Sequence, residues 1–195
     1  MAVLALNAPA DRLWTLLFLE MVVQCVELAA YVFFIRGATT VDAVTRIRYY
    51  DWVITTPVML FTLAAYMDYA RGGRESLADF ARRDAKPLAA IALSNAAMVM
   101  AGCAAERGMI SRPAGLGLGF AAYAVTFSVL WREYARHSPQ GRRLFALVSA
   151  TWALYGVAFA LEPTTKNAAY NLLDVVAKNF FGVFLAWKVA TLHAD

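Results

Sequence analysis

Six long apolar segments dominate this sequence and limit the folds that it can adopt. They cover residues 13–35, 43–67, 87–106, 113–131, 144–161 and 168–191. Each is close to the ~20 residues that an α-helix needs to cross the hydrocarbon core of a bilayer. Strands of a membrane β-barrel would alternate in polarity over roughly ten residues, and these segments do not alternate. The pattern therefore predicts an all-α transmembrane bundle with six spanning helices.

Composition and loop length favour one membrane domain. Apolar residues make up 61% of the 195 residues, against about 45–50% in soluble domains. Short polar connections rich in turn-forming residues separate the segments, and no repeat or low-complexity stretch interrupts them. We therefore expect residues 1–195 to form a single domain, with membrane lipid around it.

The distribution of charge predicts the orientation and excludes some classes of function. When the N-terminus is placed inside, most lysines and arginines face the cytoplasm, as the positive-inside rule requires. The net charge of +4 is not gathered into a basic stripe, so nucleic-acid binding is not expected. The two cysteines stand in separate apolar segments, which predicts no disulfide framework and no metal site. We expect a multi-pass protein of the plasma membrane.

A lysine lies deep in the last apolar segment. Lys178 falls near the middle of residues 168–191, and Asp174 precedes it by four residues, on the same helix face. A charged group at the centre of a membrane helix costs at least about 2.5–3.5 kcal/mol. One interpretation is an ion pair that only neutralises two charges. The other is a desolvated lysine that forms a Schiff base with an aldehyde, and the resulting cation would need a carboxylate.

The second segment supplies such a carboxylate. In the stretch RYYDWVITTP, Arg48, Asp51 and Thr55 follow one helix face at i, i+3 and i+7. Thr56 and Pro57 come next, and proline is tolerated in a membrane helix where hydroxyls or neighbours satisfy the freed carbonyl. By itself the arginine–aspartate pair could be an interfacial anchor. Together with the charged pair of the last segment, it favours a buried charged site.

Two further stripes suit a pocket for a long apolar ligand. Such stripes are more often helix packing than a cofactor site, so they support a pocket only in combination with the charged residues. Both repeat at i, i+3 and i+7 along a helix, and they consist of Trp152, Tyr155 and Phe159 in one segment and of Asn95, Met98 and Gly102 in another.

These motifs resemble those of the microbial (type 1) rhodopsins. RYYDWVITTP and the late D-x-x-x-K helix are similar to the two signature helices of that family, and the resemblance runs from about residue 13 to about residue 190. The stretches LEMVVQCVE, NAAMVMAGCAAERGMI and TKNAAYNLLDVVAKNFFGVFL look most like viral rhodopsins and mirror-proteorhodopsin-like proteins. The resemblance implies a retinal protein that forms a homo-oligomer.

The resemblance also implies a role for each of the residues described above. Lys178 would carry all-trans-retinal as a Schiff base, Asp51 would be the primary counterion and proton acceptor, and Asp174 would be the second counterion. Arg48 would lie on the outward proton path. The residues implied to surround the retinal are Trp52, Thr56, Asn95, Met98, Gly102, Trp152, Tyr155 and Phe159.

The chain departs from the family pattern at several positions. Gly156 stands where many relatives have proline and Phe159 where they have tryptophan, which changes the shape of the pocket. Thr62, eleven residues after Asp51, takes the place of the cytoplasmic proton donor, a carboxylate in many outward pumps. Segment 13–35 matches the second of the seven family helices, so the first is either truncated or absent from a six-helix variant.

Light-driven proton transport is the function that this pattern favours, with its direction open and inward movement slightly favoured. Thr55 and, in the outer loop, Glu162 are candidates for the transport path, Glu162 as a release group. Glu20, Gln24 and Glu27 form one polar stripe through segment 13–35. The same stripe could be hydrogen bonding between helices, but it also motivates an alternative function.

That alternative is a light-gated channel for small cations. A photosensor that signals to a partner is a third class, and a proton-coupled carrier without retinal is a fourth. None of the four is an enzyme.

Overall fold

The structure, a computed structural model, describes residues 8–37 and 40–191, without the side chains of residues 8–11 and 42. Among these residues there are helices and turns but no strand, so the predicted all-α fold is confirmed. The six predicted segments are α1 (Ala8–Gly37), α2 (Val41–Ala70), α4 (Ala85–Glu106), α5 (Arg112–Glu133), α6 (Pro139–Phe159) and a last helix formed by α7 (Pro163–Asp174), the π-helical turn η2 (Val175–Asn179) and α8 (Phe180–Thr191). Short helical pieces in the loops are α3 (Leu77–Arg83) and η1 (Ala135–His137).

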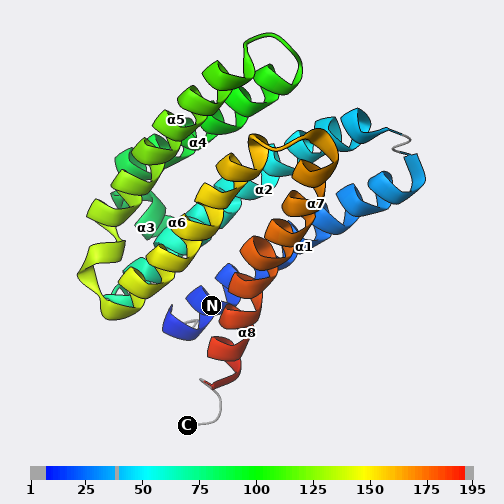
Figure 1. The fold of residues 1–195 in the computed structure, drawn as a ribbon. Coiled ribbons are helices and arrows are strands. Elements are labelled where there is room, and N and C mark those ends of the chain that lie inside the picture. The colour runs from blue at the N-terminus through cyan, green and yellow to red at the C-terminus, as the bar shows by residue number, and fades with distance from the viewer. Residues whose placement is uncertain (1–7, 38–39, 192–195) are drawn as a thin grey trace.

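The long helices run side by side as a bundle (Figure 1). By length and hydropathy, four of those described could cross a membrane, within Arg12–Gly37, Ala43–Ala70, Ala85–Glu106 and Arg112–His137. The helix α6 and the last helix lie along them (Figure 1). Arg142 and Arg143 lie near the start of α6. The π-helical turn η2 divides the last helix into two α-helical pieces of 12 residues each, and each piece is shorter than a membrane span.

The ends of the helices follow local sequence signals. Ser111 and Ser138 precede α5 and α6, and each hydroxyl accepts a hydrogen bond from a backbone N–H of the first turn. Proline follows at the first or second position of both helices, where its missing N–H costs nothing. Gly72 and Gly108, just after α2 and α4, have φ of 108° and 69°, a conformation that glycine adopts without strain.

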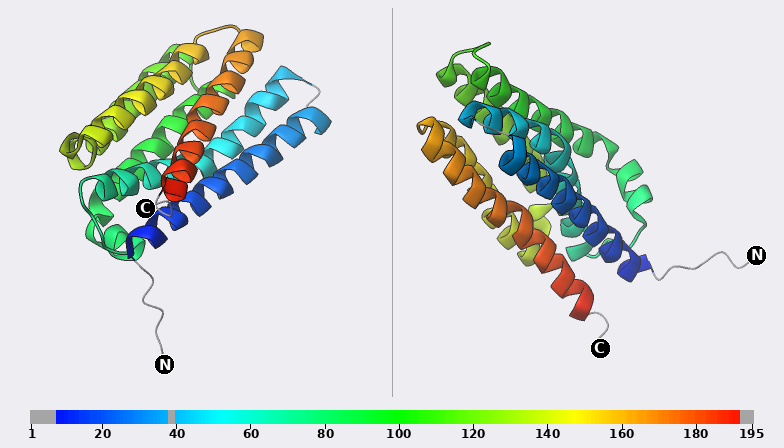
Figure 2. Two further views of the ribbon diagram at one scale, coloured as in Figure 1. Left: turned by 90° about the horizontal axis from the view of Figure 1, so that it is seen from below. Right: turned by 90° about the vertical axis from the view of Figure 1, so that its right-hand side faces the viewer.

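The first described helix starts and the last one ends at the same end of the bundle, where α3 also lies (Figure 2). We call this the inner end, because the charge distribution predicts that it faces the cytoplasm, and the opposite end the outer end. Helix α2 is the centre of the packing: it contacts α1, α4, α6 and α7. In the most apolar part of α2, 61% is buried inside the bundle, against 22–28% in the other three helices that could cross a membrane. Within the signature sequence of α2, Arg48, Asp51, Thr55 and Thr56 are therefore buried in protein, whereas Tyr50, Val53 and Ile54 are exposed on the outside of the bundle.

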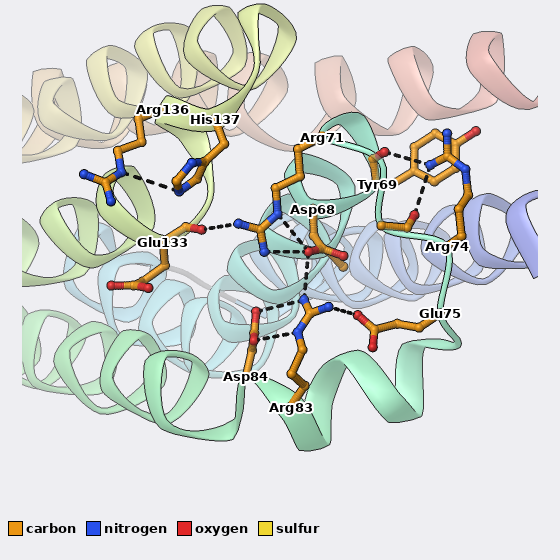
Figure 3. Close-up of polar contacts among 12 residues, drawn as sticks. Asp68, Tyr69, Arg71, Arg74, Glu75, Arg83, Asp84, Glu133, Arg136 and His137 are labelled. Atoms are coloured by element: carbon orange, nitrogen blue, oxygen red, sulfur yellow. Dashed lines mark hydrogen bonds and ion pairs between the residues drawn. The ribbon is translucent and has the colours of Figure 1, made fainter.

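A network of ion pairs closes the inner end. Its centre is the Asp68 carboxylate at the end of α2, whose side chain is 1% exposed. The partners of Asp68 are the guanidinium groups of Arg12, Arg71 and Arg83. Arg83 also pairs with Glu75 and Asp84, and Figure 3 shows these groups facing one another. The network thereby ties the start of α1 to the end of α2 and to α3.

Candidate functional site

Three carboxylates from three helices surround the Lys178 ammonium group. Its Nζ lies 2.5 Å from Asp51 Oδ2 on α2, 3.6 Å from Glu27 Oε1 on α1 and 3.8 Å from Asp174 Oδ1 on α7. The Lys178 side chain is 2% exposed, so these charges interact in a medium of low polarity, where ion pairs are strong and unpaired charges are costly. Lys178 also stands in the π-helical turn, a distortion that is frequent at functional sites.

The two aspartates are held in different ways. Asp174 receives hydrogen bonds from Arg48 Nη1, from Tyr155 Oη at 2.8 Å and from Trp52 Nε1 at 3.3 Å. Tyr31 Oη lies 3.3 Å from both Asp174 Oδ2 and Asn171 Oδ1, and its one hydrogen serves one of them at a time. By contrast, Asp51 Oδ2 has Lys178, and Asp51 Oδ1 is buried without a hydrogen-bond partner in the described part of the chain. Asp51 therefore has a free acceptor position beside the lysine nitrogen, and Asp174 has none.

Arg48 connects the cluster to the outer half of the bundle. Its guanidinium group is buried, and it bonds Asp174 with one nitrogen and Asn171 Oδ1 with the other, at 2.6 Å. Nearer the outer end, Asn167 on α7 bonds Thr45 on α2 at 3.0 Å. A line of polar groups thus leads from Lys178 towards the outer surface.

An apolar cavity begins at Lys178 and extends between α2, α4, α5 and α6. Among the residues implied by the resemblance, those that line it are Trp52, Thr56, Met98, Gly102, Trp152, Tyr155 and Phe159. Asn95 does not line the cavity, and instead donates a hydrogen bond to Thr56 Oγ1 at 2.8 Å. Residues that sequence reasoning did not propose also line it: Tyr49, Phe120, Tyr123 and Tyr170.

Glycines keep the cavity open. A Cβ atom added at Gly156 would lie 2.4 Å from the Phe120 ring, and one at Gly102 would lie 2.7 Å from the Tyr49 hydroxyl. Both distances are shorter than real contacts, so glycine is the residue that fits. An apolar space lined by aromatic side chains and by a buried amine suits an aldehyde with an apolar chain, as retinal has.

The remaining candidates lie away from Lys178. Glu20 and Gln24 face the inner half of the bundle, where the Glu20 carboxylate accepts a hydrogen bond from Thr62. The Thr55 hydroxyl bonds the Asp51 backbone carbonyl at 2.9 Å. Glu162 is exposed and caps α7, and hydrogen bonds from Thr165 hold the pKa of its carboxyl below the usual range. Glu162 is therefore ionised at neutral pH, whereas a proton-release group would have to hold a proton at that pH.

Two parts of the cluster were not proposed from the sequence. Tyr31 follows Glu27 by four residues and continues the polar stripe of α1, so its helical spacing could have identified it. Asn171 gave no such signal, because an isolated asparagine near the end of a helix has many structural roles. The proximity of Glu27 to Lys178 was also not anticipated, since helix spacing does not say which helix a stripe faces.

Comparison with known proteins identifies the family. The family model described as bacteriorhodopsin-like protein matches residues 2–192. The chain belongs to the bacteriorhodopsin-like family. Rhodopsins of this family bind retinal through a lysine and reside in membranes, so this chain is an integral membrane protein. No curated protein sequence matches it significantly.

Solved structures support the same bacteriorhodopsin-like fold. The crystal structure of the viral rhodopsin OLPVRII is 24% identical, with a TM-score of 0.81 over 96% of this chain and 86% of that one. The crystal structure of a blue light-absorbing proteorhodopsin from Med12 is 18% identical, with a TM-score of 0.70 over 94% of this chain and 85% of that one. At these identities the likeness establishes the fold, and the roles of individual residues stay predictions.

Proposed function

We propose that this rhodopsin moves protons across the plasma membrane under light, with retinal joined to Lys178. The observation that carries the proposal is the 2.5 Å contact between Lys178 Nζ and Asp51 Oδ2, together with the free second oxygen of Asp51. A carboxylate in direct contact with the nitrogen both stabilises a cation there and can receive its proton. When bound to Lys178 as a Schiff base, retinal would supply light absorption and, on isomerisation, a fall in the proton affinity of the Lys178 nitrogen.

Asp51 and Asp174 have different roles in this proposal, one in moving the proton and the other in stabilising charge. Asp51 accepts the proton from the Lys178 nitrogen. Asp174 balances the charge of Arg48, and its oxygens already accept hydrogen bonds from Arg48, Trp52 and Tyr155. Glu27 and Asp174 also lie near the nitrogen, at 3.6 and 3.8 Å, but Asp51 at 2.5 Å is the carboxylate in hydrogen-bond contact with it and is therefore the nearest acceptor.

The position of Asp51 supports outward movement. The line of polar groups from Lys178 through Asp174, Arg48 and Asn171 leads to the outer half, where the Asn167–Thr45 pair lies. Asp51 lies beside this line rather than bonded to it, since Asp51 at 2.5 Å and Asp174 at 3.8 Å both lie next to Lys178 Nζ. We propose that the proton leaves Asp51 along this line. The inward direction that the sequence slightly favoured rested on the family resemblance and on the missing donor carboxylate at Thr62.

The test is the sign of the light-induced pH change in a suspension of cells that make the protein with retinal. Outward transport acidifies the medium, and a protonophore abolishes the change. Lys178→Ala should give no visible absorption band and no pH change, whereas Lys188→Ala, a lysine near the inner end of α8, should retain both. An alkaline shift would reverse the direction, and colour in Lys178→Ala would reject the retinal site.

A cation channel is the second candidate, because Glu20, Gln24 and Glu27 line one face of α1 beside α2 and the last helix. Voltage-clamp recordings separate the two. The photocurrent of a pump keeps its direction as the voltage is swept, and that of a channel reverses near the equilibrium potential of its ion. No photocurrent at all would favour a photosensor. Assembly into a homo-oligomer stays a prediction from the family resemblance.

A further inference from the structure

Glu20 and Thr62 form a buried polar pair in the inner half of the bundle. Both residues are 0% exposed, one on α1 and the other on α2, and their side chains are in hydrogen-bond contact. A Cβ atom added at Gly182 would lie 4.0 Å from the Glu20 Cβ. Since Gly182 is one helical turn beyond Lys178, Glu20 packs against the last helix on the inner side of the lysine.

The hydrogen-bond inventory of this pair indicates that Glu20 carries a proton. The Thr62 hydroxyl contacts the Met59 carbonyl oxygen at 3.0 Å as well as Glu20 Oε1. It has one hydrogen and cannot donate it to both acceptors. A neutral Glu20 resolves the conflict, because its own O–H then donates to the Thr62 oxygen. The other carboxyl oxygen, Oε2, is buried without a partner in the described part of the chain, and an ionised carboxylate would be costly there.

Unpaired polar atoms continue from Glu20 towards Lys178. Gln24, one turn further along α1, has its Nε2 buried without a hydrogen-bond partner among the described residues. Glu27 follows, with Oε1 3.6 Å from Lys178 Nζ. Buried polar atoms without protein partners are the usual positions of ordered water. Glu20, Gln24 and Glu27 thus mark a polar route on α1 that ends at the lysine.

The inner side of Glu20 is closed. Leu13 and Leu16, earlier on α1, are 1% and 0% exposed. Beyond them, Arg12 bonds Asp68 at 2.8 Å and the Ala65 carbonyl at 2.7 Å. A proton on Glu20 is therefore shielded from the inner solution and exchanges more easily towards Lys178.

We propose that Glu20 is the acid that returns a proton to the Lys178 nitrogen after Asp51 has taken one. The proton leaves the Glu20 carboxyl, passes along Gln24 and bridging water, and binds the nitrogen. Glu20 is left as a carboxylate, to which Thr62 can then donate, and it regains a proton from the inner solution more slowly, past the Arg12–Asp68 pair that closes that side. Thr62 is a positioning residue in this step. The inference rests on the proposed function. It places the donor of the returning proton on α1, because α2 has a threonine, Thr62, where many outward pumps have the carboxylate of the cytoplasmic proton donor.

The experiment is flash photolysis of the purified pigment, which follows the return of the proton by absorbance and needs no net transport. Glu20→Gln keeps the shape and hydrogen bonding of the side chain but removes the proton. We expect the late recovery to slow by about 100-fold, the scale of a lost general acid, and to become proportional to the proton concentration of the solution. A small permeant weak acid should restore the rate. The matched control is Glu133→Gln, an exposed glutamate at the inner end, which should leave recovery unchanged.

Two further measurements sharpen the result, and the second does not depend on the folding of Glu20→Gln. Adding Thr62→Asp to Glu20→Gln should restore fast recovery by placing a carboxyl on the other member of the pair. In the unmodified protein, infrared difference spectra should show the C=O band of a protonated carboxyl disappear as the nitrogen is reprotonated. A normally coloured Glu20→Gln pigment with unchanged recovery would overturn the role of Glu20, as would the absence of that band change. Failure of the unmodified chain to form any pigment would instead reject the proposed function.

Discussion

Lys178 Nζ lies 2.5 Å from Asp51, which is 127 positions away in the sequence, and 3.8 Å from Asp174 on its own helix one turn earlier. The nearer carboxylate in sequence is thus the more distant one in space. Asp174 instead accepts hydrogen bonds from Arg48, Trp52 and Tyr155. The two aspartates should therefore respond differently to neutralisation.

Asp51→Asn should shift the visible absorption to the red. Removing the contacting counterion destabilises the ground-state cation more than the excited state, whose positive charge has moved away from the nitrogen. Proton transport should fall by at least about tenfold, because the acceptor is lost. The measurements are the absorption spectrum and the light-induced pH change. A larger red shift in Asp174→Asn would reverse the ranking of the two carboxylates.

Asp174→Asn should affect stability more than colour. It leaves the buried Arg48 without its carboxylate partner, and breaking a buried pair costs about 3–5 kcal/mol. Thermal unfolding in detergent should therefore begin at a clearly lower temperature than in Asp51→Asn. Equal melting temperatures for the two variants would contradict the different anchoring of these side chains.

Gly156→Ala should narrow the cavity and destabilise the pigment by about 1–3 kcal/mol, the usual cost of overpacking. The added Cβ would stand 2.4 Å from the Phe120 ring. The absorption maximum and the rate of retinal uptake report the change, and a second substitution, Phe120→Leu, should relieve it. Gly117→Ala is the control, because a Cβ there meets nothing within 4 Å.

Asp68→Asn should destabilise the inner end by roughly 3–5 kcal/mol, since three arginines lose a buried carboxylate. Figure 3 shows Asp68 facing Arg71 and Arg83 at the centre of this network. Hydrogen exchange of the first turns of α1 and of α3 should increase. The exposed pair of Asp79 and Arg82 is the comparison, and Asp79→Asn should change stability by less than about 1 kcal/mol. A similar effect of the two substitutions would show that burial of the network contributes nothing.

The contribution of Glu162 to stability should depend on pH. Hydrogen bonds from Thr165 and Thr164 lower the pKa of its carboxyl in the folded state, below the ordinary value of about 4.3. Its contribution is therefore fully present above that ordinary value and is lost as the pH falls through the lower, folded-state pKa. Glu162→Gln should melt at a lower temperature than the unmodified protein near neutral pH, and the difference should vanish in acid. A constant difference at all pH values would mean that the charge is not involved.

Much of this molecule follows from short-range patterns in the sequence. Six apolar runs of membrane length predicted six helices, and each is present, because hydrogen bonding within a helix is the local solution to burial in lipid. The i, i+3 and i+7 spacings placed Arg48, Asp51 and Thr55 on one face of α2. The same periodicity aligned Glu20, Gln24 and Glu27 on α1. Family resemblance then linked Lys178 to retinal.

The tertiary structure alone decided which charged groups meet. Glu27 was predicted on a transport stripe and lies 3.6 Å from Lys178, and Glu20 meets Thr62 across two helices. Helix periodicity defines the face of one helix, but the neighbour of that face depends on how six helices pack together. The close approach of Gly156 on α6 to the Phe120 ring on α5 likewise depends on how these helices pack. Ion pairs and cavities form between elements distant in the chain, so their geometry is a property of the packed bundle.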